Sequence, residues 1–294
     1  MEKKVNNTLE VYFCDIPNMG DQLNVWIINK LWGIEIVKSN IYKSKISTIG
    51  SGLGAFTTKG HHFYGIKQKI IGLFCQPVFI WGTGFIQKRK DGIEGSFFRE
   101  MNFCAVRGNL SRKRIEHILG NELKIPVGDG GILASYLVNN NCEPVSKKYD
   151  VGIVPHWREK EHPIFEKLKK TYPNSVLIDV NNNPVEVVKA ISECKVIVSS
   201  SLHGLIVADS FHIPNIHVVV TDKMIGDGFK FDDYYSAYNL EHRYIRIEEQ
   251  NIPSKDWIVD NYQVCANDVE MMKQRMIDTF PFIYDASRNC VRLK

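Results

Sequence analysis

The stretch from Lys195 to Ser210 restricts the fold of this chain more than any other, because it joins an apolar run to a helical pattern through three consecutive serines. Val196 to Val198 is β-branched and apolar, as in a buried strand of a parallel sheet. A second apolar run, Ile216 to Val220, follows the helical pattern. The order strand, turn, helix, strand predicts an α/β fold.

The turn inside this stretch reads Ser199-Ser200-Ser201-Leu202-His203-Gly204. The first N–H groups of a helix lack partners and carry a partial positive charge, so this turn is a natural seat for an anion. His203 would lie at its mouth. An alternative fits the sequence equally well: Ser200 or Ser201 only caps the helix, and His203 is a partly exposed residue of its first turn.

The rest of the chain alternates short β-branched or aromatic runs with helical patterns, which predicts parallel sheets covered by helices on both faces. The other predicted strands are 9–14, 47–50, 78–81, 103–106, 150–154 and 175–180. Helices are predicted over 163–171, 184–192, 230–235 and 268–279, with others near 109–114 and 132–137. A further helix, after residue 21, is expected to have Leu23, Trp26, Ile27 and Leu31 on one face.

The chain has 294 residues, which suits two domains better than a single core. Residues 139–148 are polar and unpatterned and form the best candidate linker. We therefore predict an N-terminal domain over 1–142, a second domain over 143–264, and a C-terminal segment, 265–294, whose helix packs back on the first domain.

Charge and cysteine usage restrict the partners. The net charge of +4 comes from dispersed lysines, which argues against nucleic acid but suits an acidic substrate or loose contact with an anionic membrane face. The seven cysteines are scattered without CxxC pairs, as in a reduced cytoplasmic protein without a zinc site. The first residues are polar and no apolar run reaches membrane-spanning length, so we expect a cytoplasmic protein.

Two further loops follow predicted strands. Asn18 to Gln22 follows the first strand, and open α/β sheets bind ligands at the carboxyl ends of their strands. Asp21 in this loop could bind a ligand, cap the helix, or do both. Arg107 follows the strand 103–106 and could hold a carboxylate or phosphate, or be a surface charge. The glycine turns at 50–54 and 82–84 lack the spacing of a dinucleotide or Walker phosphate loop.

Several motifs together resemble the polysaccharide pyruvyl transferases over nearly the whole chain. They are Asn18-x-Gly20-Asp21-x-Leu23-Asn24, Gly50-Ser51-Gly52, Trp81-Gly82-Thr83-Gly84, Val106-Arg107-Gly108, Gly128-Asp129, Val151-Gly152-Ile153-Val154-Pro155-His156, Ser200-Ser201-Leu202-His203-Gly204 and Lys230-Phe231-x-Asp233-Tyr234-Tyr235. The resemblance implies two Rossmann-like domains facing a cleft, as in GT-B glycosyltransferases. It also implies transfer of pyruvate from phosphoenolpyruvate (PEP) to two hydroxyls of a sugar, as a cyclic ketal.

The acceptor implied by the resemblance is a lipid-linked oligosaccharide or a nascent exopolysaccharide or capsule. The chain departs from the family in two places: some members have Arg where this chain has Ser201, and many have Pro where it has Gly130. The first departure leaves open which cation would hold the PEP carboxylate.

Ketal formation needs an acid near C3 of PEP, a base for the sugar hydroxyls, and donors for two anionic groups. On loop position and family resemblance, we assign His203 and Asp21 as catalytic, with Asp21 on the acceptor side. The predicted substrate-binding residues are Ser200, Ser201, Leu202, His156, Arg107, Lys230, Asn18 and Gln22. We expect no metal, and no cofactor besides PEP as donor.

Two other functions fit the same sequence. A GT-B nucleotide-sugar glycosyltransferase would need paired glutamates in the second domain, and the nearest pair, Glu186 and Glu193, precedes the serine turn on a predicted helix. A non-catalytic carbohydrate- or phosphate-binding protein would need no acid and base facing each other, so Asp21 and His203 would be freely replaceable.

Overall fold

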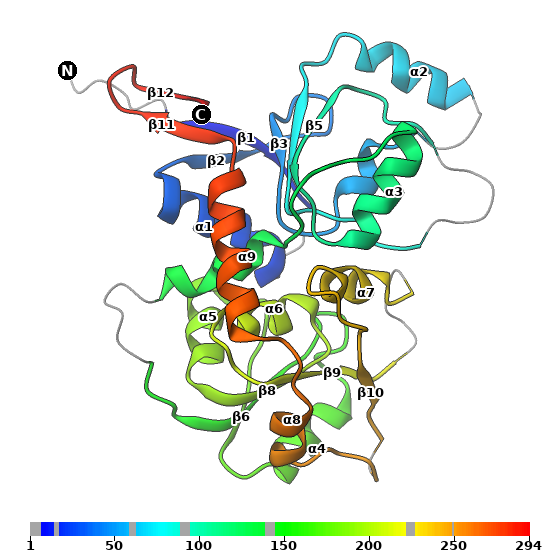
Figure 1. The fold of residues 1–294 in the computed structure, drawn as a ribbon. Helices are drawn as coiled ribbons and strands as arrows, with labels where there is room; N and C mark the ends of the chain where they lie inside the picture. Colours follow the sequence, from blue (N-terminus) through cyan, green and yellow to red (C-terminus); the bar gives the residue numbers. More distant parts are fainter. Residues whose placement is uncertain are drawn as a thin grey trace.

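The computed structural model describes residues 7–14, 18–58, 63–88, 95–138, 145–221, 227–248 and 250–294. Over these residues the chain forms two parallel five-stranded sheets and one antiparallel hairpin (Figure 1). Each sheet is associated with helices, an arrangement consistent with Rossmann-like domains. The predicted α/β class is confirmed.

The first sheet has the strand order β2-β1-β3-β4-β5, and its paired strands are parallel. Its strands are β1 (Thr8–Tyr12), β2 (Glu35–Lys38), β3 (Ile46–Ser47), β4 (Val78–Trp81) and β5 (Met101–Ala105). The helices of this half are α1 (Met19–Trp32), α2 (Phe63–Gly72) and α3 (Asn109–Leu119), with the 3₁₀ helices η1 (Leu53–Phe56) and η2 (Gly130–Leu137).

The second sheet has the order β10-β9-β8-β6-β7 and is also parallel. Its strands are β6 (Tyr149–Val154), β7 (Ser175–Leu177), β8 (Cys194–Ser199), β9 (Asn215–Val219) and β10 (Tyr244–Arg246). Its helices are α4 (Pro163–Thr171), α5 (Pro184–Ser192), α6 (Leu202–Ser210), α7 (Phe229–Ser236) and α8 (Lys255–Asn261). Alternate residues of β8 face different apolar cores: Val196 and Val198 pack with α4, and Ile197 packs with α5 and α6.

One apolar core runs through both halves of the molecule. It contains Leu9 and Ile80 of the first sheet, Ile27 of α1, Ile132 of η2 and Leu205 of α6. Because α1 contacts α5 and η2 contacts α6, burial of apolar surface fixes the two sheets relative to each other.

The C-terminal helix α9 (Ala266–Thr279) lies beside both halves of the molecule (Figure 1). The Trp81 indole N–H donates to the Met276 carbonyl at 3.0 Å, and Phe280 stacks on Trp32 with ring centroids 4.0 Å apart. The hairpin of β11 (Phe282–Asp285) and β12 (Cys290–Leu293) follows. The predicted division after residue 142 falls at 139–144, outside the described residues, and stays a prediction.

Two predicted helices are present but differ in detail from the expectation. Trp26 is 40% exposed, because the buried arc of α1 is centred on Leu23 and Ile27, with Asn24 inside it, and Trp26 lies beyond its edge. The helix predicted near 132–137 is present as the 3₁₀ helix η2, in which the Ile132 N–H donates to the Asp129 carbonyl three residues earlier. No helix in the described ranges has both the length and the apolar character needed to cross a membrane.

Candidate functional site

A cavity of about 130 Å³ lies where the carboxyl ends of strands from both sheets meet. It is lined from loops after β1, β3, β4, β6, β7 and β8, and from the start of α7. This is the place where open α/β sheets bind ligands. The lining residues are Cys14, Asn18, Asp21, Gly50, Ser51, Ile86, His156, Trp157, Arg158, Val180, Ser201, Leu202, His203 and Lys230.

The serine turn is held against β6 by its own hydroxyl groups. Ser199 Oγ donates to the Val154 carbonyl at 2.9 Å and accepts the N–H of Ser201 at the same distance. A methyl group at Gly204 would lie 2.4 Å from Ser199 Oγ, so only glycine lets α6 approach this closely. Ser201 occupies the N-cap position of α6, but its side chain makes no capping hydrogen bond. It lines the cavity at the positive end of the helix.

The imidazole of His203 lies between the start of α1 and η2. A methyl group at Gly20 would lie 2.1 Å from its Nδ1, and one at Gly131 would lie 3.5 Å from its Cδ2. Although His203 is half-buried as a residue, its Nε2 is shielded from solvent and has no hydrogen-bond partner in the described part of the chain. Burial, with the charges of Lys230 and Arg107, lowers the pKa of His203 to about 3. The ring is therefore neutral at pH 7.

Positive charge surrounds this neutral ring. Burial lowers the pKa of the Lys230 ammonium to about 8, and Arg107 adds to the effect, so Lys230 is still mostly charged at pH 7. Burial also lowers the pKa of His156 to about 3, and the charges of Lys230 and Arg158 contribute. A negative charge placed nearby would oppose each of these shifts, so the cavity favours an anionic ligand.

The opposite wall of the cavity comes from the start of α1. Asn18 caps this helix: its Oδ1 accepts the Asp21 N–H at 3.2 Å, and its Nδ2 donates to Asp21 Oδ2 at 2.7 Å. The Met19 N–H donates to the Val180 carbonyl of the second half at 2.7 Å, which holds the helix start against that half. Among the described lining residues Asp21 is the only carboxylate.

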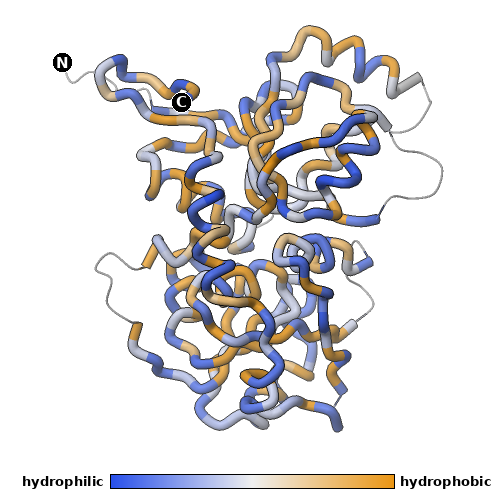
Figure 2. Tube along the Cα trace, in the orientation of Figure 1, coloured by the Kyte–Doolittle hydropathy of each residue, from blue (hydrophilic) through white to orange (hydrophobic). Residues whose placement is uncertain are grey.

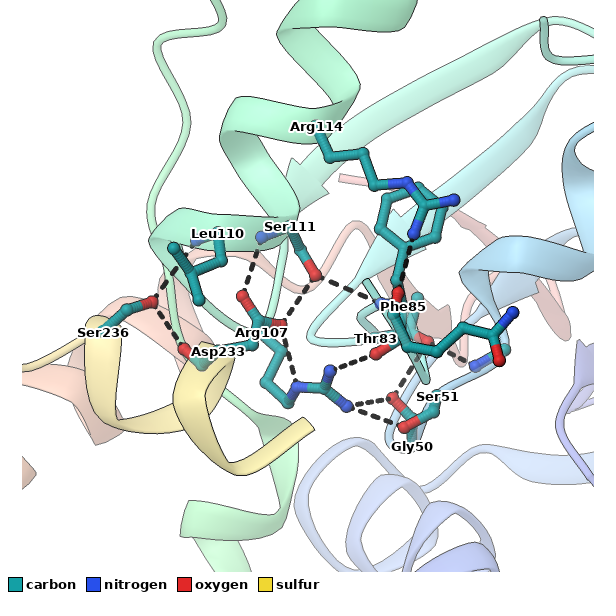
Figure 3. A network of polar contacts seen from close by, with 12 residues as sticks. Gly50, Ser51, Thr83, Phe85, Arg107, Leu110, Ser111, Arg114, Asp233 and Ser236 are labelled. Atoms are coloured by element: carbon teal, nitrogen blue, oxygen red, sulfur yellow. Dashed lines mark hydrogen bonds and ion pairs between the residues drawn. The ribbon is translucent and has the colours of Figure 1, made fainter. Parts of the chain in front are cut away.

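Arg107 is not among the described residues that line the cavity, so its predicted role as a substrate clamp stays a prediction. Its side chain is fully buried, and its Nε donates to Asp233 Oδ2 at 2.9 Å (Figure 3). Its Nη1 donates to Ser51 Oγ at 2.8 Å, and Asp233 also accepts the Ser111 N–H at 2.7 Å. Because Arg107 follows β5 and Asp233 lies on α7, this ion pair joins the two halves. Arg107 therefore acts on the cavity through its charge and through its hydrogen bond to Ser51, which lines it.

Two other predicted residues also lie outside the described lining. The hydroxyl of Ser200 accepts the His156 N–H at 2.8 Å, so Ser200 positions the loop that carries His156. Gln22 is half-buried on α1. The structure thus brings together His203, Asp21, His156, Lys230, Asn18, Ser201 and Leu202, and leaves out Arg107, Ser200 and Gln22.

Some lining residues were not predicted, although they lie next to residues that were. Arg158, whose guanidinium lies 4.8 Å from the Trp157 ring centroid, adds a second cation beside Lys230. Ser51 lines the cavity from the glycine turn after β3. Arg158, its neighbour Trp157, which also lines the cavity, and Ser51 all follow predicted strands at their carboxyl ends, so the rule that selected His156 could have found them.

A second carboxyl group is buried close to His203. Asp129 caps η2 by accepting the Gly131 N–H at 2.8 Å, and its Oδ2 has no hydrogen-bond partner within the described ranges. Burial raises the pKa of Asp129 to about 7, against the opposing effects of the Gly131 N–H and Arg107. A methyl group on Gly131 would touch both Asp129 and His203, so the two side chains flank the same glycine.

The comparisons with known proteins give a family match over most of the chain. A family model described as polysaccharide pyruvyl transferase matches residues 13–222. This range contains every cavity residue given above except Lys230.

Two relatives and one solved structure were compared. The chain is 26% identical over 260 residues to an uncharacterized protein of Acanthamoeba polyphaga mimivirus, covering 84% of this chain and 81% of that protein. It is 22% identical over 230 residues to the succinoglycan biosynthesis protein ExoV of Rhizobium meliloti, covering 78% of this chain and 64% of that protein. The chain is also 14% identical to an uncharacterized Klebsiella pneumoniae protein with a crystal structure, and the match covers 79% of this chain and 88% of that one. Its TM-score of 0.43 is too low to establish a shared fold.

Proposed function

The chain belongs to the polysaccharide pyruvyl transferase family, and we propose that it transfers pyruvate from PEP to two hydroxyls of a sugar as a cyclic ketal. The acceptor would be a lipid-linked oligosaccharide or nascent exopolysaccharide or capsule. The name of the Rhizobium meliloti relative, a succinoglycan biosynthesis protein, supports a polysaccharide precursor. We further propose that, as in GT-B enzymes, the donor and the acceptor bind to opposite halves of the molecule. The reaction would take place in the cytoplasm.

The observation that carries this proposal is the composition of the cavity. One wall supplies Lys230, Arg158, neutral His203 and the start of α6, and the facing wall supplies Asp21. A volume of about 130 Å³ is well below that of pockets for drug-sized ligands, which favours a small ligand. PEP is small and multiply anionic, so it requires the cations of the cavity, and a reacting sugar hydroxyl requires a base, which the single carboxylate can supply.

The proposed reaction makes two C–O bonds at C2 of PEP and breaks one. A proton adds to C3, C2 becomes electrophilic, and the first hydroxyl attacks it. Phosphate then leaves with the bridging oxygen, and the second hydroxyl closes the ring. One of the two hydroxyl protons balances the proton gained at C3, and the other leaves with phosphate.

His203 is the proposed proton donor to C3. In the free protein its ring is neutral, because burial and neighbouring cations lower its pKa to about 3. The carboxylate and phosphate of PEP would add negative charge beside it and raise that pKa, so PEP binding favours uptake of the proton that the reaction uses. Lys230 and Arg158 would pair with the anionic groups.

Asp21 is the proposed base for the acceptor hydroxyls. Its position in the α1 cap keeps one oxygen 2.7 Å from Asn18 Nδ2, which orients the carboxylate. Ser201 and the first N–H groups of α6 would bind a PEP anionic group, taking the place of the Arg found at this position in some members of the family.

The glycosyltransferase alternative is less well supported. Glu193 Oε1 accepts a hydrogen bond from Lys148 Nζ at 2.7 Å in an ion pair, and neither Glu186 nor Glu193 is among the described residues that line the cavity. These glutamates are therefore poorly placed to bind the ribose and diphosphate of a nucleotide sugar there.

A ligand comparison tests the proposal. PEP should raise the melting temperature, and UDP-sugars should not, because a ligand that binds only the folded state stabilises it by roughly 2.7 kcal/mol at a hundredfold excess over its dissociation constant. Incubation with PEP and a panel of lipid-linked oligosaccharides should then give a product with the mass of one added pyruvyl ketal. Stabilisation by UDP-sugars but not by PEP would favour the glycosyltransferase.

A further inference from the structure

Helix α2 (Phe63–Gly72) packs on the protein through its small and polar residues. Gly65 is buried and Gln68 is half-buried. A methyl group at Gly72 would lie 1.7 Å from the Phe98 carbonyl oxygen, so the helix backbone lies directly against this neighbouring segment. These positions, spaced by three and four residues, form the inner face of the helix.

The opposite face of α2 is apolar and exposed. Ile66 is 58% exposed, Ile70 54%, Leu73 82% and Phe74 86%. Their spacing puts them on one side of the helix and its C-terminal extension, and the adjacent Ile71 is 38% exposed. Five of the thirteen exposed large hydrophobic residues in the described chain thus lie within nine positions. A surface helix of a soluble protein has the reverse arrangement, apolar inside and polar outside.

Positive charge borders this apolar face. Lys67 and Lys69 are both exposed and, at 100° per residue, lie on its two sides. No acidic residue occurs between positions 63 and 74. An apolar face bordered by lysines is the pattern of a helix that lies in the interface of an anionic bilayer.

We propose that α2 and the following Leu73 and Phe74 bind the surface of an anionic lipid bilayer. The helix lies at the outer end of the N-terminal half, away from the second sheet (Figure 1), and apolar residues run along it (Figure 2). The apolar face enters the headgroup region, and Lys67 and Lys69 contact anionic headgroups. A second copy of the chain is a poorer occupant, because a symmetric contact would bring four lysines together without a carboxylate from α2.

This inference goes beyond the proposed reaction and rests on the surface of α2 alone. It also gives the proposed enzyme a means of reaching a lipid-linked acceptor. The test of this inference measures binding to lipid, not turnover. A negative result for bilayer binding would therefore leave the proposed reaction untouched, and a negative result for the reaction would leave bilayer binding untouched.

Vesicle co-flotation of the full chain tests the proposal. The protein should float with vesicles of phosphatidylglycerol and phosphatidylcholine and bind pure phosphatidylcholine much more weakly. The double variant Leu73→Ser/Phe74→Ser should lower the partition coefficient at least about tenfold, because two large apolar side chains no longer leave water. Lys67→Gln/Lys69→Gln should reduce binding to the anionic vesicles by roughly tenfold or more and leave the weak binding to neutral vesicles unchanged.

A matched control uses exposed apolar residues elsewhere. Trp257 and Val259 on α8 are 41% and 46% exposed, and Trp257→Ser/Val259→Ser should leave vesicle binding unchanged. If the α2 and α8 variants lost vesicle binding equally, the proposal would be overturned. It would also be overturned if the unaltered chain did not bind vesicles. A dimer in light scattering that Leu73→Ser/Phe74→Ser dissociates, without vesicle binding, would make this face a contact between copies instead.

Discussion

His203 is the residue on which the proposed chemistry depends most. His203→Gln should lower the rate of pyruvyl transfer by about 10²–10⁴, because the proton donor is lost while a side chain of similar size keeps the packing. Ser201→Ala should have a milder effect, because the N–H groups at the start of α6 remain. The rate, PEP affinity and melting temperature should be measured for both variants. A folded His203→Gln protein with most of its activity would remove His203 from the mechanism.

Asp129 should make stability depend on pH in a recognisable way. Its folded-state pKa is raised to about 7 from an ordinary value near 3.8, so the native state holds a proton that the unfolded state releases. The contribution of Asp129 to the free energy of unfolding is fully present below about pH 3.8 and declines as the pH rises to about 7. Above that pH it no longer changes. Asp129→Asn keeps the oxygen that accepts the Gly131 N–H but does not titrate.

The Asp129→Asn variant should therefore gain stability relative to the parent chain as pH rises from 4 to 7, and the difference should level off above pH 7. Urea unfolding at intervals of one pH unit gives the difference directly. A difference that does not change with pH would mean that Asp129 is not protonated in the fold.

At this scale the sequence predicted part of the site. His203, Asp21 and His156 follow strands at the sheet edges, and that rule depends only on local order along the chain. Arg107 obeys the same rule, yet it is buried against Asp233, 126 positions later. Such a pairing depends on the packing of two halves and leaves no local signal.

The start of α1 shows how one helix positions a side chain of another. Gly20 leaves space for His203, since a methyl group there would lie 2.1 Å from Nδ1. Gly20→Ala should displace the imidazole and lower the transfer rate at least tenfold, while leaving the helix itself intact, because alanine favours helix more than glycine does. Rate and circular dichroism should be compared with those of Gly33→Ala, where no atom lies within 4 Å but φ is +64°.

In that control a loss of stability without a specific loss of rate is expected, because a left-handed backbone strains alanine. A Gly20→Ala protein with the parent rate would show that the His203 position is not limiting.

Elements with strong local signals were predicted well. The helices 163–171 and 184–192 have the predicted bounds, and each begins with Pro at its first position after a capping side chain. Helix α2 and the hairpin β11–β12 were not predicted. In α2 the usual relation between apolar residues and the core is reversed, so its pattern gives no indication of which face packs inward.

At the scale of the whole molecule, the buried Arg107–Asp233 pair joins the two halves. Arg107→Ala and Asp233→Ala should each lower the free energy of unfolding by about 3–5 kcal/mol, because each leaves an uncompensated buried charge. The double variant should lose clearly less than the sum of the two. Urea denaturation of all four proteins gives the coupling energy. Additive losses would mean that the two side chains act independently.

The α/β class and the parallel sheets could be predicted from the alternation of strands and helices. The way the two halves pack could not, because it depends on contacts between distant segments such as Trp81 with Met276 and Trp32 with Phe280. These contacts come from aromatic residues whose partners no local pattern specifies.

In the proposed reaction C2 of PEP is attacked and its C–O bond breaks. PEP labelled with ¹⁸O at the bridging oxygen, incubated with the protein and a panel of lipid-linked oligosaccharides, distinguishes this bond from the P–O bond. We expect all of the label in inorganic phosphate and none in the pyruvylated sugar. Label in the pyruvyl-derived product would show attack at phosphorus and rule out the proposed reaction.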